Sequence, residues 1–222
     1  MSIITPFQSN LLKIFPQVQD AQQFYFTGGT ALSLFYLQHR RSEDLDFFTS
    51  VEGLILPFAQ LLEKKLKLSG YGVVVQRGFN SFAELKVSLA QEETIIHLAL
   101  DAVFLLQPYQ EFTEYQGLKV NSLMDVATNK LLALFGRAAL RDFIDVYYLI
   151  KMEKFTKQQL LDYAKQKDPG FDLYWLGVAF ERLKLFEQRD YDLSLVFAPL
   201  KDADLLVFFS QWRKEITQQM SS

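Results

Sequence analysis

The sequence lacks cysteine and contains little histidine. Among its 222 residues there are no cysteines, two histidines, two tryptophans and six prolines. Without cysteine the chain can form neither a disulfide nor a thiolate metal site, and two histidines are too few for a histidine-based metal centre. A reducing compartment fits this composition. Carboxylates remain as the side chains that could hold a metal ion.

Long apolar runs are also missing. No stretch reaches the roughly 20 apolar residues that a membrane-spanning helix needs. No opening segment combines basic residues, an apolar run and a small-residue cleavage site. We therefore expect a soluble, cytoplasmic protein with no membrane partner.

An excess of positive charge is absent as well. The chain has 23 Lys and Arg against 26 Asp and Glu, a formal net charge of −3. Contact with RNA or DNA would therefore require a local basic patch. Candidate patches are Arg40-Arg41, the lysines Lys64, Lys65 and Lys67, and the set Lys130, Arg137 and Arg141. For the lysines, the solvated face of an amphipathic helix is the better interpretation.

What the sequence does contain is a large apolar fraction. Half of its residues are hydrophobic and 21 are phenylalanine, enough for a full core. We expect an α/β (α+β) fold with a mixed β-sheet core over residues 1–120, flanked by helices. Helical periodicity follows over residues 121–222, and we expect this helical C-terminal region to pack on the core. Its tryptophans, Trp175 and Trp212, are predicted to be buried.

The segment Phe24–Phe48 has the most informative pattern. It is expected to form a strand, a glycine turn, a buried helix, a polar loop and a second strand. These five parts are Phe24–Thr27, Gly28-Gly29, Ala31–Leu37, His39–Glu43 and Asp44–Phe48.

Asp44 and Asp46 should point to the same side of the second strand, because strand side chains alternate between faces. Adjacent like charges are unfavourable unless something neutralises them, and Mg²⁺ prefers such oxygen ligands. A helix that begins after Gly28-Gly29 would attract phosphate. Metal and phosphate would then meet at one edge of the sheet.

Taken singly, the glycine pair is most simply a tight turn and D-x-D a solvated strand edge. In this order, with a helix of fitting length between them, the two resemble the signature of DNA polymerase β-like nucleotidyltransferases, h-G-G-[TS] followed by h-D-h-D-h. More narrowly, GGTAL…HRRSEDLDFF resembles the AbiEii/AbiGii toxin-like nucleotidyltransferase family. Residues 1–120 would then be the nucleotidyltransferase core.

The resemblance implies a third carboxylate on a neighbouring strand. Two further segments suit strands: a hairpin with its turn at Gly78–Ser81, and a strand over Thr94–Phe104. Asp101 lies in the second and is preferred, because its flanks resemble the h-D-h pattern of the family. Glu84 in the hairpin is the alternative. A simpler interpretation is that Asp101 marks the exposed end of its strand or caps a turn. His97 is expected to be a core or edge residue.

A downstream motif of the family, K-x-x-A-x-x-x-R…R-D-x-x-D, is also matched. The matching residues are Lys130, Ala133, Arg137, Arg141, Asp142 and Asp145. The resemblance implies that the lysine reaches the triphosphate while the arginines and aspartates shape the pocket. The alternative is a structural set of ion pairs, including an ordinary helical pair between Arg141 and Asp145. Gly136 leaves open whether one helix carries them all.

The resulting hypothesis is metal-dependent transfer of NMP from an NTP to an acceptor hydroxyl, with two Mg²⁺ or Mn²⁺ ions. The expected catalytic and metal-binding residues are Asp44, Asp46 and Asp101. The expected nucleotide-binding residues are Gly28, Gly29, Thr30, Arg40, Ser42, Lys130, Arg137 and Arg141, with Asp142 and Asp145 in support.

The resemblance further implies the toxin of a toxin–antitoxin or phage-defence system, with a cognate antitoxin as partner and tRNA as one acceptor. A protein hydroxyl or a small molecule would fit the acidic composition equally well. Two other hypotheses remain open. One is a catalytically silent module that binds NTP or a protein partner, and the other is an unrelated α/β protein whose D-x-D is only a strand edge.

Overall fold

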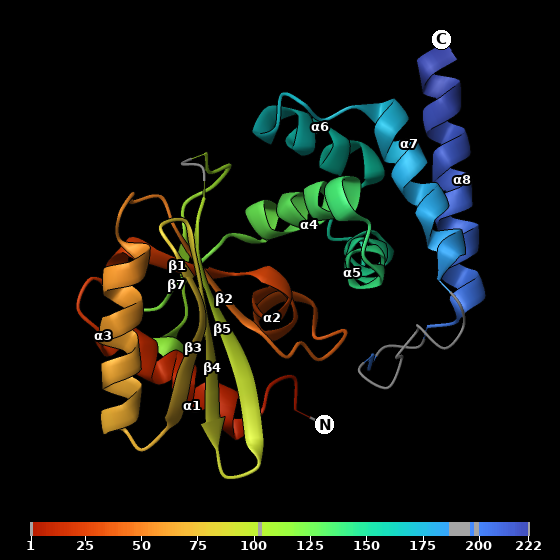
Figure 1. Cartoon of the computed structure of the whole chain (residues 1–222). Helices are drawn as coiled ribbons and strands as arrows, with labels where there is room; N and C mark the ends of the chain where they lie inside the picture. Colours follow the sequence, from red (N-terminus) through yellow and green to blue (C-terminus); the bar gives the residue numbers. More distant parts are fainter. Residues whose placement is uncertain (1, 102–103, 187–195, 198–199, 222) are drawn as a thin grey trace. The chain divides into compact units, whose positions relative to one another are not determined.

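The computed structural model describes residues 2–101, 104–186, 196–197 and 200–221. The chain divides into two compact units (Figure 1). Unit 1 comprises Met1–Tyr36 and Arg41–Leu123, and unit 2 comprises Leu37–Arg40 and Met124–Ser222. Within the described part of the chain, no helix is both long and apolar enough to cross a membrane.

Unit 1 is built on a seven-stranded mixed sheet. Among the described residues the strand order is β3-β4-β5-β2-β1-β7-β6. The β2–β5 and β1–β7 pairs are parallel and the other pairs are antiparallel. This sheet, together with its flanking helices, confirms the predicted fold class. The elements are α1 (Pro6–Ile14), β1 (Phe24–Thr27), α2 (Gly28–Leu32), β2 (Leu45–Thr49), α3 (Ile55–Leu68), β3 (Gly72–Phe79), β4 (Phe82–Leu89), β5 (Glu92–Leu100), β6 (Gln110–Glu111) and β7 (Lys119–Val120).

The connection from β1 to β2 follows the predicted order of elements, with two differences. Helix α2 begins directly at Gly28, and after Leu32 the chain continues as one π-helical segment over Ser33–Leu37. Strand β2 begins at Leu45, so Asp44 is the last loop residue and Asp46 is the second residue of the strand. The predicted hairpin is confirmed as β3 and β4, whereas β5 ends at Leu100, earlier than expected.

The core of unit 1 lies on one face of the sheet, along which α3 runs (Figure 1). Alternation in β2 sends Leu45 and Phe47 into this core, and both are fully buried. The Phe47 ring stacks on Phe15 with centroids 3.6 Å apart. Asp46, which lies between two core residues in the strand, must therefore project from the opposite face.

Unit 2 is helical in its described residues. Its helices are α4 (Leu123–Arg137), α5 (Leu140–Lys151), α6 (Lys157–Lys167), α7 (Leu173–Glu181) and α8 (Asp202–Ser221), with a short 3₁₀ segment at Arg182–Leu185. Gly136 does not interrupt α4. The break comes at Ala138, which has a φ of 49° and separates α4 from α5.

Aromatic residues of α5, α7 and α8 form the core of unit 2, and α7 and α8 lie side by side (Figure 1). Phe143 meets Phe209 with centroids 4.9 Å apart, and Phe180 meets Trp212 at 5.1 Å. The predicted burial of Trp212 is confirmed, at 1% exposure. The same prediction for Trp175 is wrong: this side chain is 59% exposed, because it lies on a different face of α7 from the buried Phe180.

We predict that Phe47→Ala lowers the free energy of unfolding by about 3–5 kcal/mol, because it removes a buried ring and leaves a cavity. Urea denaturation monitored by circular dichroism measures the change. The matched control is Phe79→Ala in β3, where the ring is 61% exposed and the expected change is within about 0.5 kcal/mol. Equal effects of the two substitutions would contradict the assigned core.

Candidate active site

Gly28 and Asp46 meet where β1 ends. The antiparallel register pairs Thr27 with Asp46, so the next residue, Gly28, passes beside the Asp46 side chain. A Cβ atom on Gly28 would lie 2.1 Å from Asp46 Oδ2, and Gly28 has a φ of +77°. Contact and backbone angle both require glycine here. The glycine turn and the second carboxylate of the acidic pair therefore lie together, as the sequence interpretation requires.

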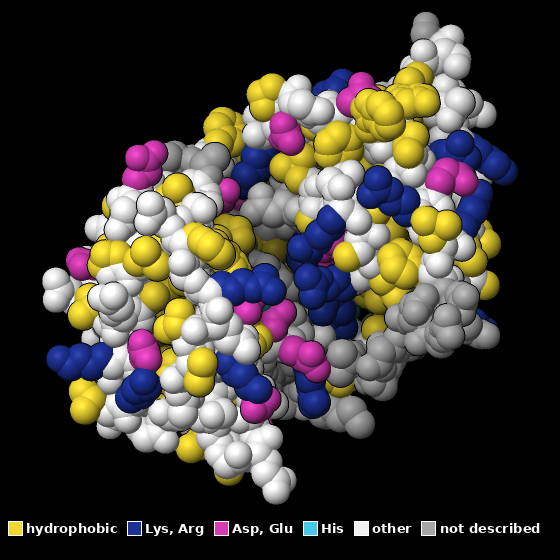
Figure 2. All heavy atoms as spheres, viewed as in Figure 1, with side chains coloured by type: hydrophobic (Ala, Val, Ile, Leu, Met, Phe, Trp, Pro, Cys, Tyr) yellow, Lys and Arg dark blue, Asp and Glu magenta, His cyan; other side chains and the backbone are white. Residues whose placement is uncertain are grey.

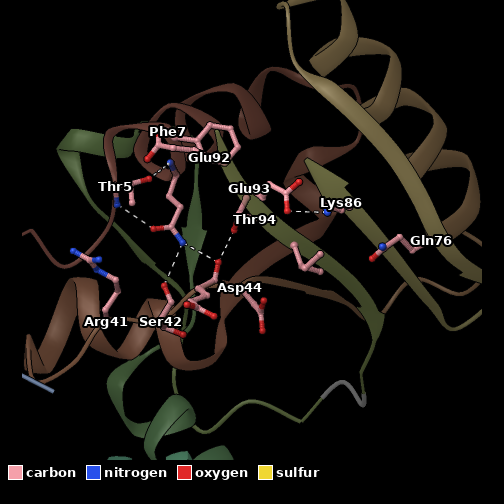
Figure 3. Close-up of a pocket in the computed structure, with 13 residues that line it drawn as sticks. Thr5, Phe7, Arg41, Ser42, Asp44, Gln76, Lys86, Glu92, Glu93 and Thr94 are labelled. Atoms are coloured by element: carbon pink, nitrogen blue, oxygen red, sulfur yellow. Dashed lines mark hydrogen bonds and ion pairs between the residues drawn. The ribbon is translucent and has the colours of Figure 1, made fainter. Parts of the chain in front are cut away.

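Asp44 lies in a loop that several hydrogen bonds hold in place. The buried Thr30 hydroxyl donates to the Asp44 carbonyl oxygen at 2.5 Å. The Gln8 side-chain amide donates to the carbonyl oxygens of Ser42 (3.2 Å) and Glu43 (2.9 Å) (Figure 3). The Thr94 hydroxyl donates to the Glu43 carbonyl oxygen at 2.5 Å. Thr30, predicted to bind nucleotide, is thus a tether for the loop.

A pocket of about 430 Å³ adjoins this loop. Figure 3 shows Ser42 and Asp44 on one side of it and Lys86 and Glu93 on another. Its charged lining consists of Arg41, Glu43, Asp44, Lys86, Glu92 and Glu93. Acidic residues therefore outnumber basic ones, and Lys86 pairs with Glu93 at 2.8 Å. The pocket favours an uncharged or cationic group over a phosphate.

A polar row crosses the face of the sheet opposite the core. Paired positions bring Asp46 of β2 beside His97 of β5, His97 beside Glu84 of β4, and Glu84 beside Arg77 of β3. His97 Nδ1 lies 3.0 Å from Asp46 Oδ1, and His97 Nε2 lies 3.6 Å from Glu84 Oε2. The hydrogen bond to Asp46 raises the pKa of His97, and the charges of Asp46, Asp44 and Glu84 raise it further against the effect of burial.

Asp101 lies apart from this row. It follows β5 and is four positions beyond His97, the register partner of Asp46, a separation of about 13 Å along the strand. The Tyr25 hydroxyl donates to Asp101 Oδ2 at 2.5 Å. The structure therefore does not bring Asp101 together with Asp44 and Asp46. Two flanking residues on which its assignment depended, 102 and 103, lie outside the described residues.

The donor set determines which metal centre the residues fit. In the part of the chain that the structure describes, no three His, Cys, Asp or Glu side chains form a metal-binding group. Mg²⁺ is commonly held by one or two carboxylates, while water and substrate phosphates complete its shell. Asp44 and Asp46, both partly exposed, fit one such ion. Two ions were expected, and the second one needs a third carboxylate. The structure does not bring one to Asp44 and Asp46, so they do not fit a pair of ions.

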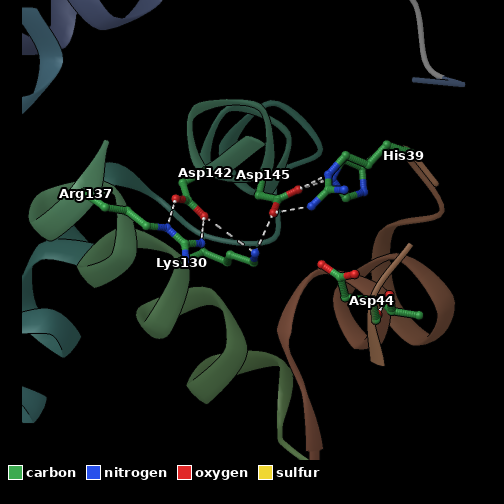
Figure 4. Close-up of polar contacts among 8 residues, drawn as sticks. His39, Asp44, Lys130, Arg137, Asp142 and Asp145 are labelled. Carbon is green, nitrogen blue, oxygen red and sulfur yellow. Dashed lines mark hydrogen bonds and ion pairs between the residues drawn. The ribbon is translucent and has the colours of Figure 1, made fainter. Parts of the chain in front are cut away.

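In unit 2, the buried Asp145 contacts the side chains of three residues (Figure 4). Its carboxylate accepts from Arg40 Nε at 2.6 Å and Nη2 at 2.8 Å, from His39 Nε2 at 2.7 Å and from Lys130 Nζ at 2.9 Å. Complete burial opposes ionisation, but the charges of Arg40 and Lys130 outweigh it and hold the Asp145 pKa well below its usual value. Burial lowers the His39 pKa despite its hydrogen bond to Asp145.

Asp142 forms the second anionic centre of unit 2. It accepts from Arg137 Nε and Nη2 at 2.7 and 2.9 Å, and Lys130 Nζ lies 3.7 Å away (Figure 4). Lys130 therefore spans Asp142 and Asp145, as the interpretation of a structural set of ion pairs requires. The helical pair expected between Arg141 and Asp145 is replaced by the contact of Asp145 with Arg40.

Three of these contacts were not foreseen in the sequence. His39 and Arg40 lie in a charged loop about a hundred residues from their partner Asp145, and no local pattern signals that distance. His97 was expected to be a core or edge residue. The sequence did contain a signal for its contact with Asp46. In TIIHLALDAVF, alternation places His97 on the face opposite Leu98.

Comparisons with known proteins show which family and which folds this chain resembles. The model of the family described as nucleotidyl transferase AbiEii toxin, type IV TA system, matches residues 10–222. An uncharacterised protein of Aquifex aeolicus is 25% identical over 156 residues, which cover 67% of this chain and 68% of that protein.

Two solved structures share the fold. A candidate nucleotidyltransferase from Helicobacter pylori has a TM-score of 0.61 at 18% identity, covering 97% of this chain and 93% of its own. The nucleotidyltransferase toxin MenT4 of Mycobacterium tuberculosis has a TM-score of 0.61 at 16% identity, covering 95% of this chain and 82% of its own.

We predict that Gly28→Ala destabilises the chain more than Gly53→Ala. Both glycines have positive φ (77° and 75°), but a Cβ on Gly53 meets nothing within 4 Å, whereas one on Gly28 overlaps Asp46. Gly53→Ala thus measures the backbone strain alone, of order 1 kcal/mol. The additional loss of stability in Gly28→Ala measures the steric clash with Asp46. Thermal unfolding of both variants measures it, and equal midpoints would contradict the Gly28–Asp46 contact.

We predict that Asp145→Asn lowers stability by about 3–5 kcal/mol at pH 7, because Arg40 and Lys130 both lose the buried charge of Asp145, and Lys130 keeps only its longer contact with Asp142. The Asp145 pKa is lowered in the folded chain, so its stabilising contribution is complete above the ordinary aspartate pKa near 4 and is lost as the pH falls through the folded value. Urea titrations from pH 7 to pH 3 should show that the difference in free energy of unfolding between wild type and Asp145→Asn becomes smaller. A difference in free energy of unfolding that does not depend on pH would contradict the conclusion that Asp145 is ionised in the folded chain.

Proposed function

Because this chain belongs to the AbiEii family of nucleotidyltransferase toxins of type IV toxin–antitoxin systems, we propose that it transfers a nucleoside monophosphate from an NTP to an acceptor hydroxyl. The observation that carries the proposal is the contact between the glycine turn and Asp46. It brings a backbone that phosphate can approach closely next to a carboxylate that can hold a metal ion.

In this proposal Gly28 and Gly29 lie against the phosphates, since neither has a side chain to keep them away. Asp44 and Asp46 would hold a divalent cation, Mg²⁺ or Mn²⁺. When bound, that ion would neutralise the triphosphate and activate the acceptor hydroxyl. Thr30 and Gln8 act indirectly, because their hydrogen bonds fix the loop that carries Asp44.

The bonds that change are those at the α-phosphorus. The acceptor oxygen forms a bond to it, the bond to the β-phosphate oxygen breaks, and pyrophosphate leaves. The acceptor proton passes to a carboxylate of the Asp44–Asp46 pair. Such chemistry depends on positioning and on charge neutralisation more than on a covalent nucleophile, which suits a chain without cysteine.

The pocket beside Asp44 would take a part of the substrates that carries no phosphate, either the nucleoside or the acceptor hydroxyl. Its lining supports this assignment, since Glu43, Glu92 and Glu93, which are not proposed metal ligands, repel phosphate. Ser42 contributes to this pocket through its place in the loop. Of the two predicted candidates for the third carboxylate, Asp101 lies far along the sheet and Glu84 is separated from Asp46 by His97. We propose that the reaction proceeds without either.

Lys130, Arg137 and Arg141 remain proposed nucleotide-binding residues of unit 2. Arg137 supports this role best, since its side chain is 51% exposed while it is held by Asp142. Lys130 and Arg40 are largely buried against Asp145, and we propose that they first stabilise unit 2. Asp142 and Asp145 orient these cations.

We propose a cytoplasmic toxin that a cognate antitoxin opposes, as membership of a type IV family suggests. Total cellular RNA, tRNA included, is the first acceptor to test, followed by protein. On the visible face of unit 1, basic and acidic side chains are intermixed (Figure 2). An RNA acceptor would have to be recognised on such a surface through few local contacts.

We predict that Asp46→Ala abolishes transfer of label from every radiolabelled NTP to RNA or protein, because it removes a proposed metal ligand. Its thermal unfolding midpoint should change little, since the relieved repulsion with Asp44 is offset by the loss of the hydrogen bond to His97. The matched control is Glu111→Ala, an exposed carboxylate on β6, which should transfer as wild type does. Transfer that persists in Asp46→Ala would overturn the metal assignment. Mg-NTP binding without any labelled product would favour a catalytically silent module.

A further inference from the structure

His97 holds Asp46 in one orientation. The two residues are register partners on neighbouring parallel strands, and His97 Nδ1 lies 3.0 Å from Asp46 Oδ1. The other oxygen, Oδ2, is the atom that lies against Gly28. The two oxygens of this carboxylate therefore have different surroundings: one is bound to the histidine and the other faces the glycine turn.

The imidazole is itself fixed on its far side. Its Nε2 lies 3.6 Å from Glu84 Oε2, and the Phe82 ring packs against it with centroids 5.6 Å apart. Both ring nitrogens thus face carboxylates, which leaves neither as an open ligand for a metal ion. The ring is 23% exposed, so the contact to Asp46 is shielded from much of the solvent.

We propose that His97 is a positioning residue: its Nδ1–H donates to Asp46 Oδ1 and thereby keeps Oδ2 turned toward Gly28, where a nucleotide and its divalent cation bind. Glu84 holds the ring in the plane that makes this possible. The inference rests on the proposed function, because it assigns His97 to the same site. It adds a residue that acts through Asp46 without touching the substrate.

Removing the imidazole frees the Asp46 carboxylate to rotate. The freed carboxylate then presents its oxygens less well to a cation, and neighbouring Asp44 repels it. Loss of such an outer partner lowers metal affinity or activity by about 10–100-fold in known metal sites. Asparagine can restore the hydrogen bond, because its amide nitrogen occupies nearly the place of Nδ1.

The test measures binding of a non-hydrolysable NTP analogue with Mg²⁺ by calorimetry, for wild type, His97→Ala and His97→Asn. We expect His97→Ala to bind about 10–100-fold more weakly and His97→Asn to stay within about 3-fold of wild type. With EDTA in place of Mg²⁺ the variants should bind alike, since the histidine acts through the metal ligand. The control is Arg77→Gln, at the exposed end of the same row and 3.8 Å from Glu84, which should bind as wild type does.

Several outcomes overturn the inference. They are unchanged binding by His97→Ala in Mg²⁺, an equal loss in His97→Ala and His97→Asn, a loss that persists in EDTA, and a wild type that does not bind the Mg²⁺ complex. The proposed function fails differently: wild type binds the analogue with Mg²⁺ yet transfers no label to any acceptor. In that case the binding series still decides whether His97 orients Asp46.

Discussion

The pairing of β1 with β2 is the constraint on which the site depends. The two strands are antiparallel, yet about seventeen residues separate them, including α2 and the π-helical segment. Their register places Asp46 beside the last residue of β1. A shift of one residue would turn Asp46 into the core and Phe47 out of it. Burial of Leu45 and Phe47 therefore fixes the position of Asp46 as well as the fold.

A second constraint operates within unit 2. Asp145 is fully buried, and its charge is acceptable there because Arg40, Lys130 and His39 satisfy its oxygens. The short segment Leu37–Arg40 belongs to unit 2 although the sequence around it belongs to unit 1. The motif GGTAL…HRRSEDLDFF, which is one segment in the sequence, is thus divided between the two compact units. The contacts of His39 and Arg40 with the buried Asp145 explain why Leu37–Arg40 belongs to the helical unit.

The sequence was sufficient for the local features and insufficient for the distant ones. Strand β1, the glycine turn and the in–out alternation of β2 follow from neighbouring residues, so they could be predicted. The partner of Asp145 could not be, because an arginine and a histidine in a charged loop give no sign of where they bind. The position of Asp101 shows the same limit. Its apolar flanks resembled a motif, but only the register of β2 against β5 reveals how far it lies from Asp46.

Glycine 28 illustrates what the structure adds even where the prediction succeeded. From the sequence it was a turn residue, for which flexibility is sufficient explanation. In the structure its missing side chain has a second purpose, because a Cβ would occupy the space of Asp46 Oδ2. A residue at this position must satisfy both the positive φ and the contact.

The two carboxylates of the acidic pair are held by different forces. The strand ladder and His97 fix Asp46, whereas side-chain tethers from Thr30, Gln8 and Thr94 fix the loop that carries Asp44. These contacts limit how far the backbone that carries each carboxylate can move. If Asp44 and Asp46 hold a divalent cation, as we propose, the backbone that carries them would not first have to be ordered when the ion binds. Affinity for the ion should therefore depend on tethers that never touch it.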